Sequence, residues 1–147
     1  MRVAEPFSFS GLIFSVRFAD FDSRFIVFFE LAGFSLLILG VIVRCLAMKT
    51  LGIYFSYTLS AEKCAHPLVD YGVYKYIRHP GYLGVFLITL SLPFIHASLI
   101  GFLTTAIFSL LYIIKRISYE ENLMVNALGG SYTAYMRKTK RLIPFIY

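Results

Sequence analysis

The sequence predicts an all-α integral membrane protein with about three full transmembrane helices, the second and third of which form a tight hairpin. Its 147 residues are 59% hydrophobic and only 15% charged, and the mean hydropathy is +0.74. Soluble domains are about half apolar and about a quarter charged, and a soluble chain of this length could not bury so many Phe, Leu and Ile side chains. Two long apolar blocks and the distribution of the basic residues support the same fold class.

The N-terminal segment, residues 1–24, precedes the first span. Within it the apolar run 7–16 is too short to cross a bilayer, so it predicts an interfacial or partly inserted helix. The first full span is predicted at residues 25–47, about the 20 residues that a hydrocarbon core requires. Arg44 and Lys49 mark its inner end, because basic side chains anchor helices at the membrane interface.

A polar, turn-rich loop at residues 48–81 separates the two apolar blocks. Its turn signals include two His-Pro pairs, His66-Pro67 and His79-Pro80. A loop of over thirty residues is too long for a simple connector, and Tyr, Leu and Val recur regularly along it. We therefore expect this loop to be ordered and functional.

The second apolar block, residues 82–114, predicts a helical hairpin. As one straight helix its 33 residues would be roughly 50 Å long, which exceeds a hydrocarbon core of about 30 Å. Pro93 supplies the break within the run 92–98, because proline fits poorly in a helix interior. The chain then returns to its starting side at Lys115.

The remaining segment, residues 115–147, is predicted to leave the membrane as a helix that ends near Leu128. Gly129-Gly130 stops this helix, and Ser131 is positioned to cap a short helix that follows. A basic tail follows, with the basic run at residues 137–141 and a short apolar segment at residues 142–147. No internal repeat divides the sequence, so we interpret residues 1–147 as a single domain.

The basic residues indicate which loops face the cytoplasm. Up to Arg24 the chain has three basic and three acidic residues, whereas from Arg44 onward it has eleven basic residues against four acidic ones. Under the positive-inside rule, loop 48–81 and the C-terminus are cytoplasmic and the N-terminus lies outside. Because these basic residues flank membrane segments, we expect no nucleic-acid partner.

Two polar clusters remain as candidates for chemistry once common motifs are excluded. The sequence has no glycine-rich phosphate loop, and its three histidines lack metal-ligand spacing, so no metal site is predicted. The first cluster is residues 66–84, with its paired His-Pro units and interleaved tyrosines. An interfacial collar of aromatic residues accounts for Tyr71 and Tyr76, but it does not account for the His-Pro pairs.

The second cluster follows the hairpin. Arg116 and Glu120 are four residues apart and share one helix face, whereas Glu121 points about 100° away. One interpretation is a stabilising salt pair worth a few tenths of a kcal/mol. The other is a functional pair, because ionisable groups beside membrane segments tend to be functional.

Several motifs together resemble the isoprenylcysteine carboxyl methyltransferase family in order and spacing. RHPxYxG alone also occurs in phospholipid methyltransferases and sterol reductases, but its combination with RxxxEE and a terminal proline-aromatic segment is specific. The resemblance covers residues 40–144. It is carried by Gly72-Val73-Tyr74, Arg78-His79-Pro80-Gly81-Tyr82-Leu83-Gly84, Arg116 with Glu120-Glu121, Gly130, Tyr132, Tyr135 and Pro144-Phe145.

The resemblance implies a membrane methyltransferase with S-adenosyl-L-methionine as its cofactor, bound at the cytoplasmic side. Arg116 and Glu120 are the implied catalytic residues, and Arg116 faces the methyl acceptor. The implied cofactor contacts are His66, Pro67, Leu68, Val69, Tyr74, His79, Pro80, Gly81, Tyr82 and Glu120.

The implied acceptor is lipid-anchored or lipophilic and presents an isoprenylcysteine-like carboxylate, while membrane lipids surround the chain. Three alternatives stay open. A phospholipid, amine or small-thiol methyltransferase would use the same cofactor site, and a sterol-reductase-like enzyme would bind NADPH. A non-enzymatic scaffold would use its basic tail to hold anionic lipid.

Overall fold

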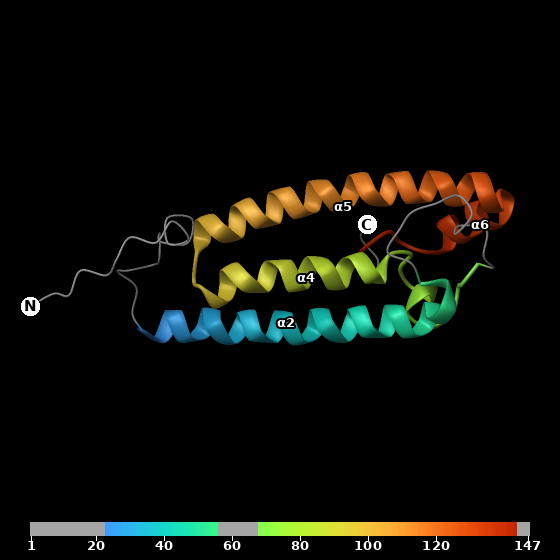
Figure 1. Cartoon of the computed structure of the whole chain (residues 1–147). Helices are drawn as coiled ribbons and strands as arrows, with labels where there is room; N and C mark the ends of the chain where they lie inside the picture. Colours follow the sequence, from blue (N-terminus) through green and yellow to red (C-terminus); the bar gives the residue numbers. More distant parts are fainter. Residues whose placement is uncertain (1–22, 56–67, 144–147) are drawn as a thin grey trace, which may run out of the picture.

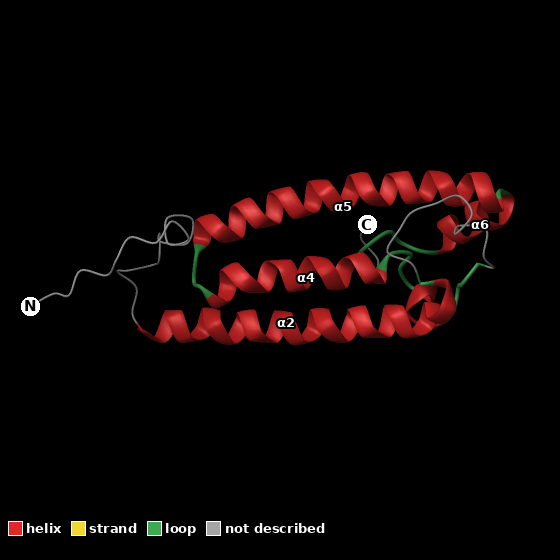
Figure 2. Cartoon of the chain, in the orientation of Figure 1, coloured by secondary structure: helices red, strands yellow, loops and turns green. Residues whose placement is uncertain are grey.

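The computed structural model describes residues 23–55 and 68–143, and the described chain consists of helices and loops (Figure 2), with an isolated parallel bridge between Ile77 and Lys140. The predicted interfacial helix at 7–16 lies outside these residues. The elements, in chain order, are α2 (Ser23–Leu51), the 3-10 turns η1 (Gly52–Tyr54) and η2 (Gly72–Lys75), α4 (Pro80–Ile95), α5 (Leu99–Leu128) and α6 (Gly130–Lys138).

The three long helices run side by side, with α4 between α2 and α5 (Figure 1). The start of α2 and the turn from α4 to α5 lie at one end of the bundle. At the other end lie η2, α6 and the start of the tail (Figure 1). Residues that precede α4 are therefore brought next to residues that follow α5, although these are far apart in sequence.

Glycines allow α2 and α4 to approach each other closely. A Cβ added to Gly40 would lie 2.9 Å from the carbonyl oxygen of Gly84, and one added to Gly84 would lie 2.8 Å from that of Gly40. Gly33 meets Ile95 in the same way further along. Small residues at such crossings are characteristic of helix packing in membranes, where close backbone contact replaces the hydrophobic driving force.

Two of the helices, α2 and α5, are long and apolar enough to cross a membrane, and many of their large apolar side chains are exposed. Helix α4 is shorter than the full span that the sequence predicted. Its 16 residues reach about 24 Å, because it begins at Pro80 and ends at Ile95, just past Pro93 in its last turn. The predicted hairpin is confirmed, with one full-length arm and one short arm.

The helix ends show one correct and one wrong prediction. Helix α5 runs without interruption from the apolar block to Leu128, and Gly129 ends it with a φ of 55°. The predicted cap by Ser131 is wrong, because Gly129 is also the N-cap of α6 and Ser131 already lies in its first turn. At the other end, Ser98 caps α5 by accepting a hydrogen bond from the amide of Gly101 at 3.1 Å.

Candidate functional site

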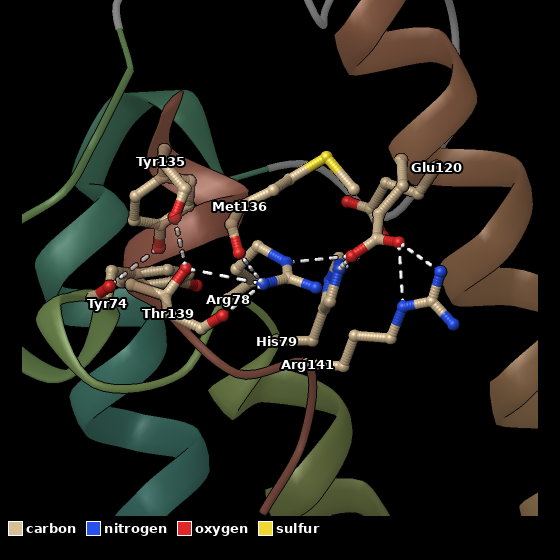
Figure 3. A network of polar contacts seen from close by, with 9 residues as sticks. Tyr74, Arg78, His79, Glu120, Tyr135, Met136, Thr139 and Arg141 are labelled. Carbon is tan, nitrogen blue, oxygen red and sulfur yellow. Dashed lines mark hydrogen bonds and ion pairs between the residues drawn. The ribbon is translucent and has the colours of Figure 1, made fainter. Parts of the chain in front are cut away.

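The candidate site lies where residues 76–79, just before α4, pair with residues 140–141, which follow α6. Backbone hydrogen bonds join the two segments: Arg78 N–H donates to the carbonyl of Lys140 (2.8 Å), His79 N–H to that of Arg141 (3.0 Å), and Lys140 N–H to that of Tyr76 (3.3 Å). Side chains of α5 then reach this pair of segments from the opposite side (Figure 3). The local backbone is thus fixed by residues from both ends of the fold.

His79 lies between two carboxylates. Its Nδ1 is 3.8 Å from Glu120 Oε2, and its Nε2 is 3.4 Å from Glu121 Oε1. The imidazole is buried, Glu121 is almost completely buried, and Glu120 retains 27% exposure of its side chain. The two neighbouring acids of α5 therefore contact opposite nitrogens of one ring, and Glu120 is the one that faces outward.

Tyr82 connects His79 to Arg116. The rings of His79 and Tyr82 have centroids 5.8 Å apart with their planes at 47°. The Tyr82 hydroxyl accepts a hydrogen bond from Arg116 Nε at 3.2 Å. The structure thus brings His79, the N-cap of α4, and Tyr82 of α4 together with Arg116 and Glu120 of α5.

Two buried polar atoms in this cluster have unsatisfied hydrogen-bonding capacity. Within the described residues, His79 Nε2 and Glu120 Oε2 are buried without a hydrogen-bond partner, although His79 Nε2 is within ion-pair distance of Glu121. Leaving such a group unsatisfied costs about 1–3 kcal/mol, so native proteins rarely tolerate it without a reason. These two atoms fit a polar ligand that offers both donors and acceptors.

The Tyr74 side chain is buried behind the cluster. Burial raises the pKa of its phenol, and the negative charge of Glu120 raises it further. The Tyr74 carbonyl accepts a hydrogen bond from the Tyr135 hydroxyl at 2.6 Å, and burial also raises the pKa of Tyr135, which keeps that donor protonated. Tyr135 of α6 therefore holds η2 in place.

The other predicted cofactor residues lie on the approach to α4 or in its first turn. Val69 is buried against Ala47 and Tyr74, and Leu68 beside it is half-buried. Pro80 is buried at the first position of α4, and the carbonyl of Gly81 accepts a hydrogen bond from Arg44 at 3.1 Å. His66 and Pro67 lie outside the described residues.

The sequence did not single out Glu121 as part of the site, yet it is the most connected acid of the cluster. Arg78 Nε donates to its Oε1 at 2.8 Å, and Arg141 donates to its Oε2 from Nε at 2.9 Å. Arg78 also donates to the carbonyls of Met136, at 3.1 Å, and of Thr139 (Figure 3). The signal that could have identified Glu121 was the adjacent acid pair itself. Neighbouring residues on one helix point in different directions, so the two acids contact different partners.

The fold and this cluster define a class of protein: a bundle of apolar helices that carries a buried, charged, ligand-compatible site at one end. A family model described as the isoprenylcysteine carboxyl methyltransferase (ICMT) family matches residues 32–126. The chain belongs to the isoprenylcysteine carboxyl methyltransferase family. Its predicted all-α membrane fold class is thereby confirmed.

Individual relatives agree with this membership. The chain is 34% identical over 144 residues to the protein-S-isoprenylcysteine O-methyltransferase of Schizosaccharomyces pombe, covering 95% of this chain and 60% of the relative. It is 32% identical over 140 residues to that of Dictyostelium discoideum, covering 90% of this chain and 59% of the relative. The chain thus spans about 60% of the length of these curated relatives.

A solved structure shows the same fold. The eukaryotic intramembrane Ras methyltransferase ICMT matches with a TM-score of 0.76 and 30% identity, over 81% of this chain and 43% of that chain. Together with the family membership, this likeness identifies the protein as an intramembrane protein.

Proposed function

We propose that this protein is an S-adenosyl-L-methionine-dependent methyltransferase that methylates the carboxylate of an isoprenylcysteine-like, lipidated acceptor at the cytoplasmic membrane face. The observation that carries the proposal is the convergence of His79, Tyr82, Arg116 and Glu120 at one end of an apolar bundle. His79 Nε2 and Glu120 Oε2, which have no hydrogen-bond partner within residues 23–55 and 68–143, support a polar ligand there. The names of the relatives support the reaction class.

The cofactor side of the site is proposed to use His79, Glu120 and the surrounding tyrosines. Bound S-adenosyl-L-methionine would supply an electrophilic methyl group on a positively charged sulfur. Glu120 is suited to accept hydrogen bonds from an ammonium or hydroxyl group, and His79 to donate one to a carboxylate. Tyr74 and Tyr82 offer aromatic faces, which attract cations. We assign His66, Pro67, Leu68, Val69, Pro80 and Gly81 to the same cofactor-binding segment.

Arg116 is proposed to orient the methyl acceptor. Its guanidinium carries donors in a fixed fork that matches a carboxylate, and the hydrogen bond from Nε to Tyr82 restrains its direction. A carboxylate is already ionised near neutral pH, so the chain does not need to supply a general base. The protein's part in catalysis is then to align two reactants and keep water away.

The position of the site suits two reactants of different solubility. The exposed apolar faces of α2 and α5 suit contact with lipid, from which a lipophilic acceptor can approach laterally. The excess of basic residues after Arg44 supports a cytoplasmic location for the site, where a water-soluble cofactor is available.

The proposal is tested with the purified full chain in lipid nanodiscs. S-adenosyl-L-methionine with a labelled methyl group is supplied together with S-farnesylcysteine that has a free carboxylate. We expect a base-labile methyl ester, and no product from the matched carboxamide. Methylation of phosphatidylethanolamine, a long-chain amine or a small thiol instead would point to the related methyltransferases. Binding of NADPH in calorimetry would favour a reductase, and binding of neither cofactor would favour a scaffold.

A further inference from the structure

We propose that Glu121 and Arg141 form a clasp that holds the C-terminal tail against His79 and thereby sets the affinity of the cofactor site. This inference rests on the proposed function. Glu121 and Arg141 are positioning residues in it, because they act on the cofactor through His79. The tail is here residues 139–142, and the clasp is the ion pair between the two side chains.

The clasp is a close, paired contact. Arg141 approaches a single carboxylate oxygen, Glu121 Oε2, with Nε at 2.9 Å and Nη2 at 2.8 Å. The Glu121 side chain is only 3% exposed, so this contact lies largely out of water and is weakly screened. Contacts of this kind hold their geometry better than ion pairs on an open surface.

The clasp also closes a ring of three residues. Arg141 contacts Glu121 through its side chain, and its carbonyl accepts the hydrogen bond from the His79 amide at 3.0 Å. His79 Nε2 in turn lies 3.4 Å from Glu121 Oε1. Because each member touches the other two, releasing Arg141 from Glu121 would loosen the backbone that fixes the imidazole.

The next tail residue couples the clasp to the rest of the site. Leu142 is 2% exposed and packs with Ile113 and Ile117 of α5, and Tyr82 packs against this cluster. A tail that detaches would therefore remove support from Tyr82 as well as from His79. The tail acts as one wall of the site.

Because of Arg78, the clasp can be removed without leaving the buried Glu121 carboxylate unpaired. Arg78 pairs with the other oxygen of Glu121, Oε1, at 2.8 Å, and it also donates to the carbonyls of Met136 and Thr139. If Arg141 is replaced, Glu121 still has a cationic partner and is not left as an uncompensated buried charge. The Arg141 side chain is itself 32% exposed, so a neutral replacement remains solvated.

The test compares Arg141→Gln with Arg137→Gln in the full chain in nanodiscs. Arg137 lies exposed on α6, close in sequence, and serves as the matched loss of one guanidinium. For Arg141→Gln we expect the dissociation constant for S-adenosyl-L-methionine to rise about tenfold and its dissociation rate to rise with it. Arg137→Gln should leave both unchanged. A lower melting temperature with an unchanged dissociation constant would overturn the clasp, because a merely structural role predicts that result.

A second readout needs no cofactor. Amide hydrogen exchange of Arg78 and His79 should be at least several-fold faster in Arg141→Gln than in wild type or Arg137→Gln, because both amides lose fixed acceptors in the tail, the carbonyls of Lys140 and Arg141. Unchanged exchange in this segment would overturn the clasp even if the protein methylates its acceptor. If exchange is faster in Arg141→Gln but the wild-type protein does not bind S-adenosyl-L-methionine, the contact itself stands. The proposed link to that cofactor, and with it the proposed function, is then overturned.

Discussion

The hydroxyl of Tyr82 on α4 accepts a hydrogen bond from Nε of Arg116 on α5 at 3.2 Å, so one side-chain contact joins α4 and α5 within the site. The same tyrosine ring faces His79. In the proposed function, Tyr82 therefore lies between the cofactor residues and the residue that orients the acceptor. This arrangement separates effects on cofactor binding from effects on turnover.

Tyr82→Phe is expected to impair turnover more than cofactor binding. The substitution keeps the aromatic ring beside His79 and removes only the acceptor for Arg116, which would then be less restrained. We expect kcat/KM for a farnesylated carboxylate to fall about tenfold, corresponding to roughly 1.4 kcal/mol of lost orientation. Steady-state kinetics and calorimetry measure the two effects, with the exposed Tyr119→Phe as control. A fall in cofactor affinity as large as the fall in turnover would contradict this separation.

His79→Ala and Glu120→Gln are each expected to weaken cofactor binding. Among the residues that the structure describes, His79 and Glu120 each present a buried atom without a hydrogen-bond partner, which a bound ligand would satisfy. Each lost charge-assisted hydrogen bond costs roughly 1.5–3 kcal/mol, or about 10- to 150-fold in affinity. Calorimetric titration measures this, and Glu30→Gln, on an exposed position of α2, is the neutral control. If both variants bind S-adenosyl-L-methionine as tightly as wild type, these residues serve the fold alone.

Gly84→Ala is expected to destabilise the bundle. A Cβ there would lie 2.8 Å from the backbone nitrogen of Arg44 and 2.8 Å from the carbonyl oxygen of Gly40, so α2 and α4 must separate. Overpacking of this kind costs about 1–3 kcal/mol. Thermal unfolding in nanodiscs measures the loss. Gly130→Ala is the matched control, because a Cβ at that position meets nothing within 4 Å, and an equal melting temperature for the two variants would show that the crossing tolerates expansion.

Sequence patterns predicted the parts of this fold that depend on local periodicity. The apolar blocks, the break near Pro93 and the stop at Gly129 each follow from neighbouring residues, and the structure has them. The short length of α4 could not be read from hydropathy, because the apolar block continues through the turn without a change in composition. The cap by Ser131 failed because Gly129, two residues earlier in the chain, is the N-cap of the same helix.

Within the site, helix spacing predicted orientation but not partners. It separated Glu120 from Glu121 by their directions, yet the partners of Glu121 lie 43 residues before it, at Arg78, and 20 residues after it, at Arg141. Such contacts depend on how the tail folds back onto the loop, and no local pattern specifies that. Arg141, a member of the basic tail, is anchored by Glu121 through such a contact.

Arg116→Lys tests the role of Arg116 most directly, because lysine keeps the charge and removes the planar fork. If Arg116 orients a carboxylate, cofactor affinity should stay nearly constant while kcat/KM falls about 10- to 100-fold, equivalent to roughly 1.4–2.7 kcal/mol. If Arg116 serves only as a helix-face partner of Glu120, lysine should substitute well.

The nature of the acceptor changes the expected outcome for Arg116→Lys. An amine or thiol acceptor gives an arginine less reason to matter, so a mild effect on turnover would favour those relatives over a carboxylate methyltransferase. Arg137→Lys on the exposed face of α6 controls for the exchange of residue type. A large loss of cofactor affinity in Arg116→Lys would instead place Arg116 on the cofactor side of Tyr82, against the role proposed for it.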